Sequence, residues 1–243
     1  MRLNISNSYS PNFSLPKRRK KMVKFIVIHY TGMKSESSAI KRLCDESKNV
    51  SAHYFIKKNG QIINLVPDLY IAWHAGKSSW QNYKSINKNS IGIEIQNPGH
   101  DNGYENFTSK QLGSLKVLLK ILIRKYEINL KNVLGHSDIA PERKKDPGEK
   151  FPWKNFAKYK LAIWHKLNEF KIKKSRKKIL DKNDEIKFIK NLNRFGYRNI
   201  KKTNFDLNKK LIIKAFQRRF RQSLINGIPD QECLLISKNL IKS

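Results

Sequence analysis

KFIVIHYT, residues 24–31, is a run of β-branched and aromatic residues that ends in polar ones. Such a run predicts a short buried strand, because these side chains pack well on a pleated surface. The polar end brings His29 to the tip of the strand, where a side chain projects into a cleft rather than into a core. We therefore expect a sheet around this strand and a polar site at its end.

Two further stretches extend the predicted sheet. AHYFIKK (52–58) and QIINLV (61–66) flank Asn59-Gly60, the strongest short-range signal for a hairpin with a type I′ turn. SIGIEIQN (90–97) alternates isoleucines with Gly92, Glu94 and Gln96, so its two faces differ. Glu94 is thus predicted on the face opposite the isoleucines.

Helices alternate with these strands. Thr108 and Gln111 have the spacing of a capping box, and apolar residues then recur at helical spacing as far as Tyr126. VLGHSDI (133–139) predicts a short strand that delivers His136, and the helix expected after Pro152 carries apolar residues as far as Leu167. The alternation across residues 24–170 predicts one α/β domain.

The remainder of the chain has a different pattern. Like charges at 171–178 indicate a linker or an exposed helix end, and apolar residues at helical spacing follow over 186–195, 207–220 and, after a turn at 226–230, in a last short helix. The predicted organisation is therefore an N-terminal extension (1–20), an α/β domain (21–170), a basic linker (171–180) and a small all-α domain of about three helices (181–243).

The net charge of +32 comes from 51 Lys and Arg residues against 19 Asp and Glu residues. A field of this sign predicts an acidic partner: nucleic acid, an anionic lipid surface or a carboxylate-bearing polymer of the cell wall. The alternative is that much of the excess is lysine on solvated faces. Charge alone does not choose among these.

Cysteine content and hydropathy set further bounds. Cys44 and Cys233 lack the C-x-x-C spacing of a thiolate metal site and are expected to be ordinary buried thiols. The N-terminus lacks the apolar run of a signal peptide, and no stretch has the ~18 apolar residues of a membrane span. The chain is expected to be soluble, and the compartment stays open.

Two histidines and one aspartate form a candidate metal site. His29 and His136 are expected at strand ends, and Asp146 follows His136 in GHSDIAPERKKDPG (135–148). Two imidazoles and a carboxylate leave a fourth zinc position open for water, as in catalytic zinc sites. The ligands are far apart in sequence, however, so for each histidine a hydrogen-bonded structural role stays open on spacing alone.

Five motifs occur in a fixed order: IVIHYT, SAHYFIKKNGQI, AWHAGKSSW, NSIGIEIQN and GHSDIAPERKKDPG. Over residues 20–165 this series resembles the zinc amidases that share the fold of peptidoglycan recognition proteins, the N-acetylmuramoyl-L-alanine amidases of AmpD and AmiD type. The resemblance implies a mixed central β-sheet flanked by helices. It also implies zinc held by His29, His136 and Asp146, with Glu94 and Lys144 as catalytic residues.

The implied reaction is hydrolysis of the amide between N-acetylmuramic acid, including its 1,6-anhydro form, and L-Ala of the stem peptide. Glu94 is expected to take the proton of the attacking water and return it to the leaving amine, while Lys144 stabilises the oxyanion. Some relatives have a catalytic Tyr where Ala52 stands. The acid/base role is therefore expected to rest on Glu94.

Three residues within or just beyond these motifs are candidate substrate contacts: His53, His74 and Trp80. For His53 the alternative is a hydrogen bond that holds strands together, and for Trp80 it is structural burial. His100 and His165 match no family motif.

NRFGYRN, LIIKAFQRRFRQ and INGIPDQECLLISKNL, within residues 193–240, resemble a three-helix peptidoglycan-binding domain. Its presence favours an envelope or secreted amidase, and a cytoplasmic recycling enzyme is the alternative because no signal peptide is visible. Peptidoglycan or muropeptides are the expected partners, nucleic acid is not favoured, and the oligomeric state stays open. The rival function is a non-catalytic peptidoglycan receptor of the same fold, which usually lacks the full zinc-ligand set.

Overall fold

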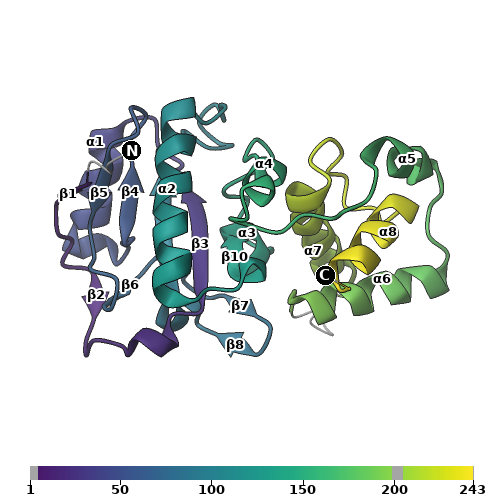
Figure 1. Ribbon diagram of the computed structural model, residues 1–243, viewed down its shortest axis with the longest axis horizontal. Helices are drawn as coiled ribbons and strands as arrows, with labels where there is room; N and C mark the ends of the chain where they lie inside the picture. The colour runs from purple at the N-terminus through teal and green to yellow at the C-terminus, as the bar shows by residue number, and fades with distance from the viewer. Residues whose placement is uncertain (1–4, 199–204, 243) are drawn as a thin grey trace.

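The computed structural model describes residues 5–198 and 205–242. It has two parts: one contains a β-sheet with its helices, and the other, beside it, consists of helices (Figure 1). The main sheet has six strands in the order β1-β5-β4-β9-β3-β10. Only β4 and β5 pair antiparallel, so the sheet is mixed as predicted. These strands are β1 (Ile5–Asn7), β3 (Phe25–Tyr30), β4 (Tyr54–Ile56), β5 (Ile62–Asn64), β9 (Ser90–Ile95) and β10 (Val133–Gly135).

The strand predicted from KFIVIHYT is β3, and it lies between β9 and β10. Its alternate side chains separate onto two faces: Ile26 and Ile28 join the core under helix α2 (Ser109–Tyr126), whereas Phe25 and Val27 join a second core. The capping box predicted at Thr108 begins α2. Both faces of β3 are thus buried, and its side chains become accessible only where the strand ends.

Short elements complete the sheet-containing part. Small two-stranded sheets pair β2 (Phe13–Ser14) with β6 (Ile71–Ala72) and β7 (Ser79–Trp80) with β8 (Tyr83–Lys84). The short helices are α1 (Glu36–Cys44), α3 (His136–Ile139) and α4 (Trp153–Lys158). The N-terminal segment belongs to this part of the fold, because β1 pairs with β5 and the side chain of Arg18 is buried.

Two local predictions are wrong. The β4–β5 hairpin forms, but Gly60 has a φ of +85° while Asn59 is absent from the left-handed region, so the turn is not type I′. Gly60 N donates to Lys57 O, which fits a type I turn followed by a left-handed glycine. Helix α4 ends at Lys158 rather than continuing to Leu167, and Lys160 has a positive φ.

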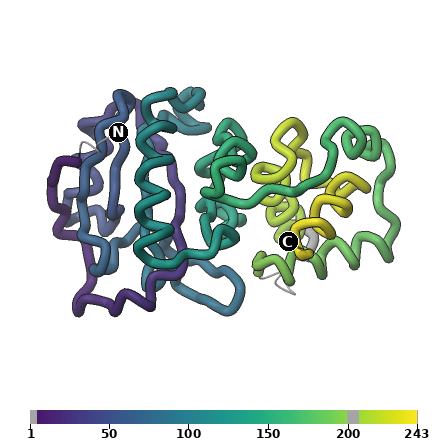
Figure 2. Tube along the Cα trace, viewed as in Figure 1, coloured from purple at the N-terminus to yellow at the C-terminus, as the bar shows by residue number. Residues whose placement is uncertain are grey.

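The C-terminal part consists of α5 (Glu169–Lys173), α6 (Lys182–Phe195), α7 (Phe205–Phe220) and α8 (Gln231–Leu240). After α4 the chain passes along these helices and reaches α5 before it turns back into α6 (Figure 2). Apolar residues of α6, α7 and α8 form one core with Phe25, Val27 and Leu134 of the sheet. The three helices therefore cover the sheet at its β10 end.

The cysteines and the hydropathy of the helices can also be compared with the predictions. Cys44 and Cys233 are free thiols, Cys233 buried and Cys44 partly buried. Within the described residues, none of the helices combines the length and the hydropathy that crossing a bilayer requires.

Candidate active site

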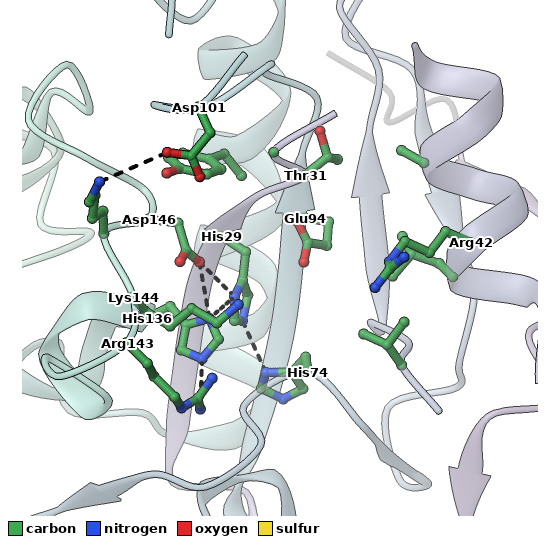
Figure 3. Close-up of a pocket in the computed structure, with 16 residues that line it drawn as sticks. His29, Thr31, Arg42, His74, Glu94, Asp101, His136, Arg143, Lys144 and Asp146 are labelled. Atoms are coloured by element: carbon green, nitrogen blue, oxygen red, sulfur yellow. Dashed lines mark hydrogen bonds and ion pairs between the residues drawn. The ribbon is translucent and has the colours of Figure 1, made fainter. Parts of the chain in front are cut away.

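The three predicted metal ligands meet at the carboxyl ends of β3 and β10. These strands pair in parallel with Gly135 opposite Ile28, so His29 and His136, which follow that pair, emerge side by side. The loop after α3 returns Asp146 to them, and Ser137 N donates to Asp146 O. His29 Nδ1 lies 2.9 Å from His136 Nδ1 and 3.0 Å from Asp146 Oδ2, and His136 Nδ1 lies 3.1 Å from that oxygen (Figure 3).

A chain of hydrogen bonds determines which nitrogen of His29 carries a proton. Ser90 Oγ donates its single proton to Ile86 O, so His74 Nε2, 3.0 Å from that oxygen, must donate to it. His74 Nδ1 is then an acceptor, and His29 Nε2 donates to it over 3.0 Å. His29 Nδ1 is left with a lone pair that faces the other two donor atoms.

The proton of His136 is also placed on Nε2. Its Nε2 lies 3.2 Å from Ala75 O, which can only accept, so Nε2 carries a proton and the neutral ring has its lone pair on Nδ1. Burial, followed by the neighbouring His136, lowers the pKa of His29 to about 4, so the ring is neutral near pH 7.

The donor set fits a zinc ion. Three buried lone-pair donors face one another at 2.9–3.1 Å with no proton assigned between them, an arrangement that a cation stabilises. Ligands held at ~2.0–2.1 Å in a tetrahedron lie about 3.3 Å apart, only slightly farther than these atoms. Two imidazoles and one carboxylate also form a known class of catalytic zinc site.

Glu94 lies directly beside this group. It is paired in register with His29 across β3 and β9, and both side chains point into the same space (Figure 3). Its Oε2 is buried and has no hydrogen-bond partner among the described residues. Burial, and then the negative charge of Asp146, raise the pKa of Glu94 to about 8. An unpartnered buried carboxyl of this kind indicates a missing cation, water or substrate group.

The donors and Glu94 open onto a cavity of about 320 Å³. Lys144, half-buried on the loop before Asp146, lines this cavity beside them. Arg42 of α1, Arg143 and Lys145 line it as well, so four basic side chains share the wall with Glu94, Asp101 and Asp146. The four basic side chains can attract carboxylates of a substrate.

The structure corrects two of the three predicted substrate contacts. Trp80 is fully buried and packs edge-on against Phe195 and Tyr197 of the C-terminal part. His53 is also fully buried, where its Nδ1 accepts a hydrogen bond from Gly92 N. Neither side chain lines the cavity, because other residues of the protein bury both.

His74 does line the cavity, but its hydrogen bonds go to His29 and Ser90. Ser90 was not among the predicted site residues. Ser90 could have been found from the sequence, because it begins SIGIEIQN and strand alternation places it on the same face as Glu94.

The sequence matches one known protein family. A model of the family described as N-acetylmuramoyl-L-alanine amidase matches residues 18–149. The matched range includes β3 with His29, β9 with Glu94, and the whole segment from His136 to Asp146.

Individual proteins and solved structures are similar over most of the chain. The amidase AmiD of Escherichia coli is 34% identical over 232 residues, which cover 90% of this chain and 83% of AmiD. The structure of AmiD with anhydro-N-acetylmuramic acid-L-Ala-D-γ-Glu-L-Lys superposes with a TM-score of 0.80 at 32% identity and covers 91% of this chain and 89% of that one. AmpDh3 of Pseudomonas aeruginosa, in complex with an anhydromuramic pentapeptide, also has a TM-score of 0.80, at 30% identity and 96% coverage of both chains.

Proposed function

The chain belongs to the N-acetylmuramoyl-L-alanine amidase family, and we propose that His29, His136 and Asp146 hold the zinc ion required for its activity. It is a hydrolase that cleaves the amide between N-acetylmuramic acid and L-Ala. The observation that carries the zinc proposal is the meeting of three unprotonated donor atoms within 3.1 Å of one another. Zinc held by these residues would lower the pKa of water at the site to about 7 and would polarise the scissile carbonyl.

We assign the proton transfers to Glu94. The carboxylate accepts a proton from the attacking water and returns it to the amine that leaves with the L-Ala residue. Its unpartnered Oε2, buried beside His29, supports this role, because no protein group in the described residues competes for the proton. A cation at the donors also favours the ionised form of Glu94, in which it can act as a base.

We assign stabilisation of the oxyanion to Lys144. Attack on the amide carbonyl places negative charge on its oxygen, and an ammonium group held at the cavity wall lowers the energy of that state. Lys144 is half-buried, whereas its neighbour Lys145 is exposed, and Lys145 Nζ lies 3.9 Å from Asp101 Oδ1. The two lysines therefore offer a matched pair for testing which of them contributes.

We propose anhydro-muropeptides as substrates, because AmiD and AmpDh3 were solved with such ligands. The four basic side chains of the cavity wall support this proposal, since stem peptides carry carboxylates. Peptidoglycan binding by residues 181–243 stays a prediction. The rival of a non-catalytic receptor is disfavoured, because all three donor atoms are present.

The test of these roles is turnover of a synthetic anhydromuramyl tripeptide by four forms of the enzyme with equal zinc content. Glu94→Gln is expected to lose at least about 100-fold in kcat, and Lys144→Met about 10- to 100-fold. Lys145→Met is the control and should keep the kcat of the unmodified enzyme, with any loss confined to KM. Normal turnover by Glu94→Gln would overturn the assignment of the base.

Substrate preference is tested by mass spectrometry of the products from intact sacculi and from soluble anhydro-muropeptides. Release of peptides from both supports a wall hydrolase, whereas release only from the soluble compounds supports a recycling enzyme.

A further inference from the structure

We propose that the C-terminal helices position the ligand His136, through a buried contact of Arg219 and Tyr197 with Asp138. The inference rests on the proposed metal role of His136. It gives residues 182–240 a function in building the catalytic site that differs from capture of the polymer.

The first observation is that Arg219 of α7 holds the chain on both sides of His136. Its Nη1 donates to Asp138 Oδ2 over 2.7 Å, two residues after the histidine, and its Nη2 donates to Val133 O over 2.9 Å, three residues before it. Val133 belongs to the edge strand β10, and no further strand of the described residues lies beside it to accept or donate hydrogen bonds. One guanidinium thus fixes the strand that leads to the ligand and the helical turn that begins with it.

Tyr197 completes the contact. Its hydroxyl donates to Asp138 Oδ1 over 2.6 Å, while Asp138 Oδ2 also accepts from Gly135 N over 2.8 Å. Both carboxylate oxygens are therefore engaged, one with Tyr197 and the other with Arg219 and the backbone immediately before His136. Asp138, Arg219 and Tyr197 are each at most 2% exposed.

Helix α3 needs this support because it has only four residues, His136–Ile139. A single helical turn gains few backbone hydrogen bonds for the residues that it orders, so it is not stable by itself. Its orientation must come from the groups that pack against it. Two of those groups, Arg219 and Tyr197, come from the C-terminal part, 81 and 59 residues away along the chain from Asp138.

The surroundings of Arg219 allow little movement. Its guanidinium carbon lies 4.7 Å from the ring centre of Trp153, in the sheet-containing part, and 4.9 Å from that of Phe220, in the C-terminal part. A second contact fixes the two parts at β7, where Gln81 N donates to Gly196 O and Trp80 packs against Tyr197. Because replacing a buried ion pair by apolar residues often costs little net stability, we explain this pair by the geometry that it defines.

The experiment measures the zinc dissociation constant of the full chain by competition with a chromophoric chelator, together with kcat and KM. Arg219→Lys keeps the charge but loses the two-pronged contact, and Tyr197→Phe removes a single hydroxyl. Each is expected to weaken zinc binding by about tenfold and to lower kcat with little change in KM.

Two controls separate positioning from general destabilisation. Arg221→Lys alters the ion pair with Asp230, a buried pair of similar chemistry inside the C-terminal part. Tyr126→Phe removes a hydroxyl that donates over 2.7 Å to Asp68, a buried carboxylate away from the site. Both controls should bind zinc like the unmodified chain.

Zinc binding and kcat that are unchanged in folded Arg219→Lys and Tyr197→Phe would overturn the positioning role. The positioning role is also overturned if the two controls weaken zinc binding as much as these variants do, because the loss would then come from general destabilisation. If the unmodified chain itself binds no zinc, the metal assignment fails first, and the two failures are thereby distinguished.

Discussion

His74 connects His29, a proposed metal ligand, to the interior of the protein. Its two ring nitrogens bond to His29 and Ser90, which leaves His29 Nδ1 unprotonated. The sequence placed His74 near the site, but the direction of its hydrogen bonds depends on the single proton of Ser90, which no motif encodes. His29, His136, Asp146 and Glu94 could be selected from the sequence, because the motifs that contain them are local.

The first prediction concerns this contact. His74→Leu removes the acceptor for His29 and is expected to weaken zinc binding by about 10- to 100-fold. His74→Asn retains an oxygen near the position of Nδ1 and should restore much of the loss. Competition with a chelator measures both. Equal zinc affinity in His74→Leu and the unmodified chain would show that the contact does not orient His29.

At the scale of elements, the strands were predicted better than the loops. The alternation in β9 and the capping box of α2 are local patterns, and both are present in the structure. The helix expected to continue to Leu167 was wrong because apolar residues at 161–167 pack from a loop, Leu161 in the sheet core and Leu167 in the C-terminal core. Their spacing reflects contact with a distant part of the chain rather than helical periodicity.

A second prediction concerns Gly92 in β9. A Cβ at this position would lie 2.3 Å from the His74 ring, so Gly92→Ala must displace the ring that contacts His29. We expect a loss of about 1–3 kcal/mol in unfolding free energy, measured with denaturant, together with weaker zinc binding. The control is Gly113→Ala in α2, where a Cβ meets no atom within 4 Å and a gain of about 0.5–1 kcal/mol is expected. Equal effects of the two substitutions would contradict the close approach of His74.

A third prediction concerns Asp68, which joins β4 to α2. Burial opposes its ionisation, but hydrogen bonds from Lys125, Tyr54 and Tyr126 outweigh it and hold the pKa of Asp68 below its ordinary value of 3.8. A lowered folded pKa gives stability that is complete above the unfolded pKa and is lost as pH falls through the folded one.

Asp68→Asn should therefore cost about 2 kcal/mol at pH 7 and less below pH 4, as judged from denaturant unfolding at each pH. Asp101→Asn, at a side chain that is 91% exposed, should change the profile little. A cost of Asp68→Asn that is the same at pH 3 and pH 7 would exclude a lowered pKa.

At the scale of the whole molecule, the sequence indicated a second group of helices but not its relation to the site. Phe195, Phe216 and Phe220 share one core with Phe25 and Leu134 of the sheet. The apolar spacing of α6 and α7 predicts that these helices have a buried face without revealing what covers it. The contact of Arg219 with Asp138 joins residues 81 apart, and such a pairing emerges only from the tertiary structure.

A fourth prediction concerns the net charge of +32. If this charge assists binding to an anionic polymer, the KM for intact sacculi should rise about tenfold between 50 and 500 mM NaCl, because salt screens the field. The KM for a small soluble anhydro-muropeptide should change much less. Equal salt dependence for the two substrates would indicate that the charge has no role in binding the polymer.

The most direct test of the zinc site is the metal content of the purified chain, measured by inductively coupled plasma mass spectrometry. We expect one zinc ion per unmodified chain and less than about a tenth of that in Asp146→Ala, since two imidazoles alone bind zinc weakly. Asp101→Ala, which changes a carboxylate at the rim of the same cavity, should keep the full content. Stoichiometric zinc in Asp146→Ala, or none in the folded unmodified chain after incubation with zinc, would contradict the site formed by His29, His136 and Asp146.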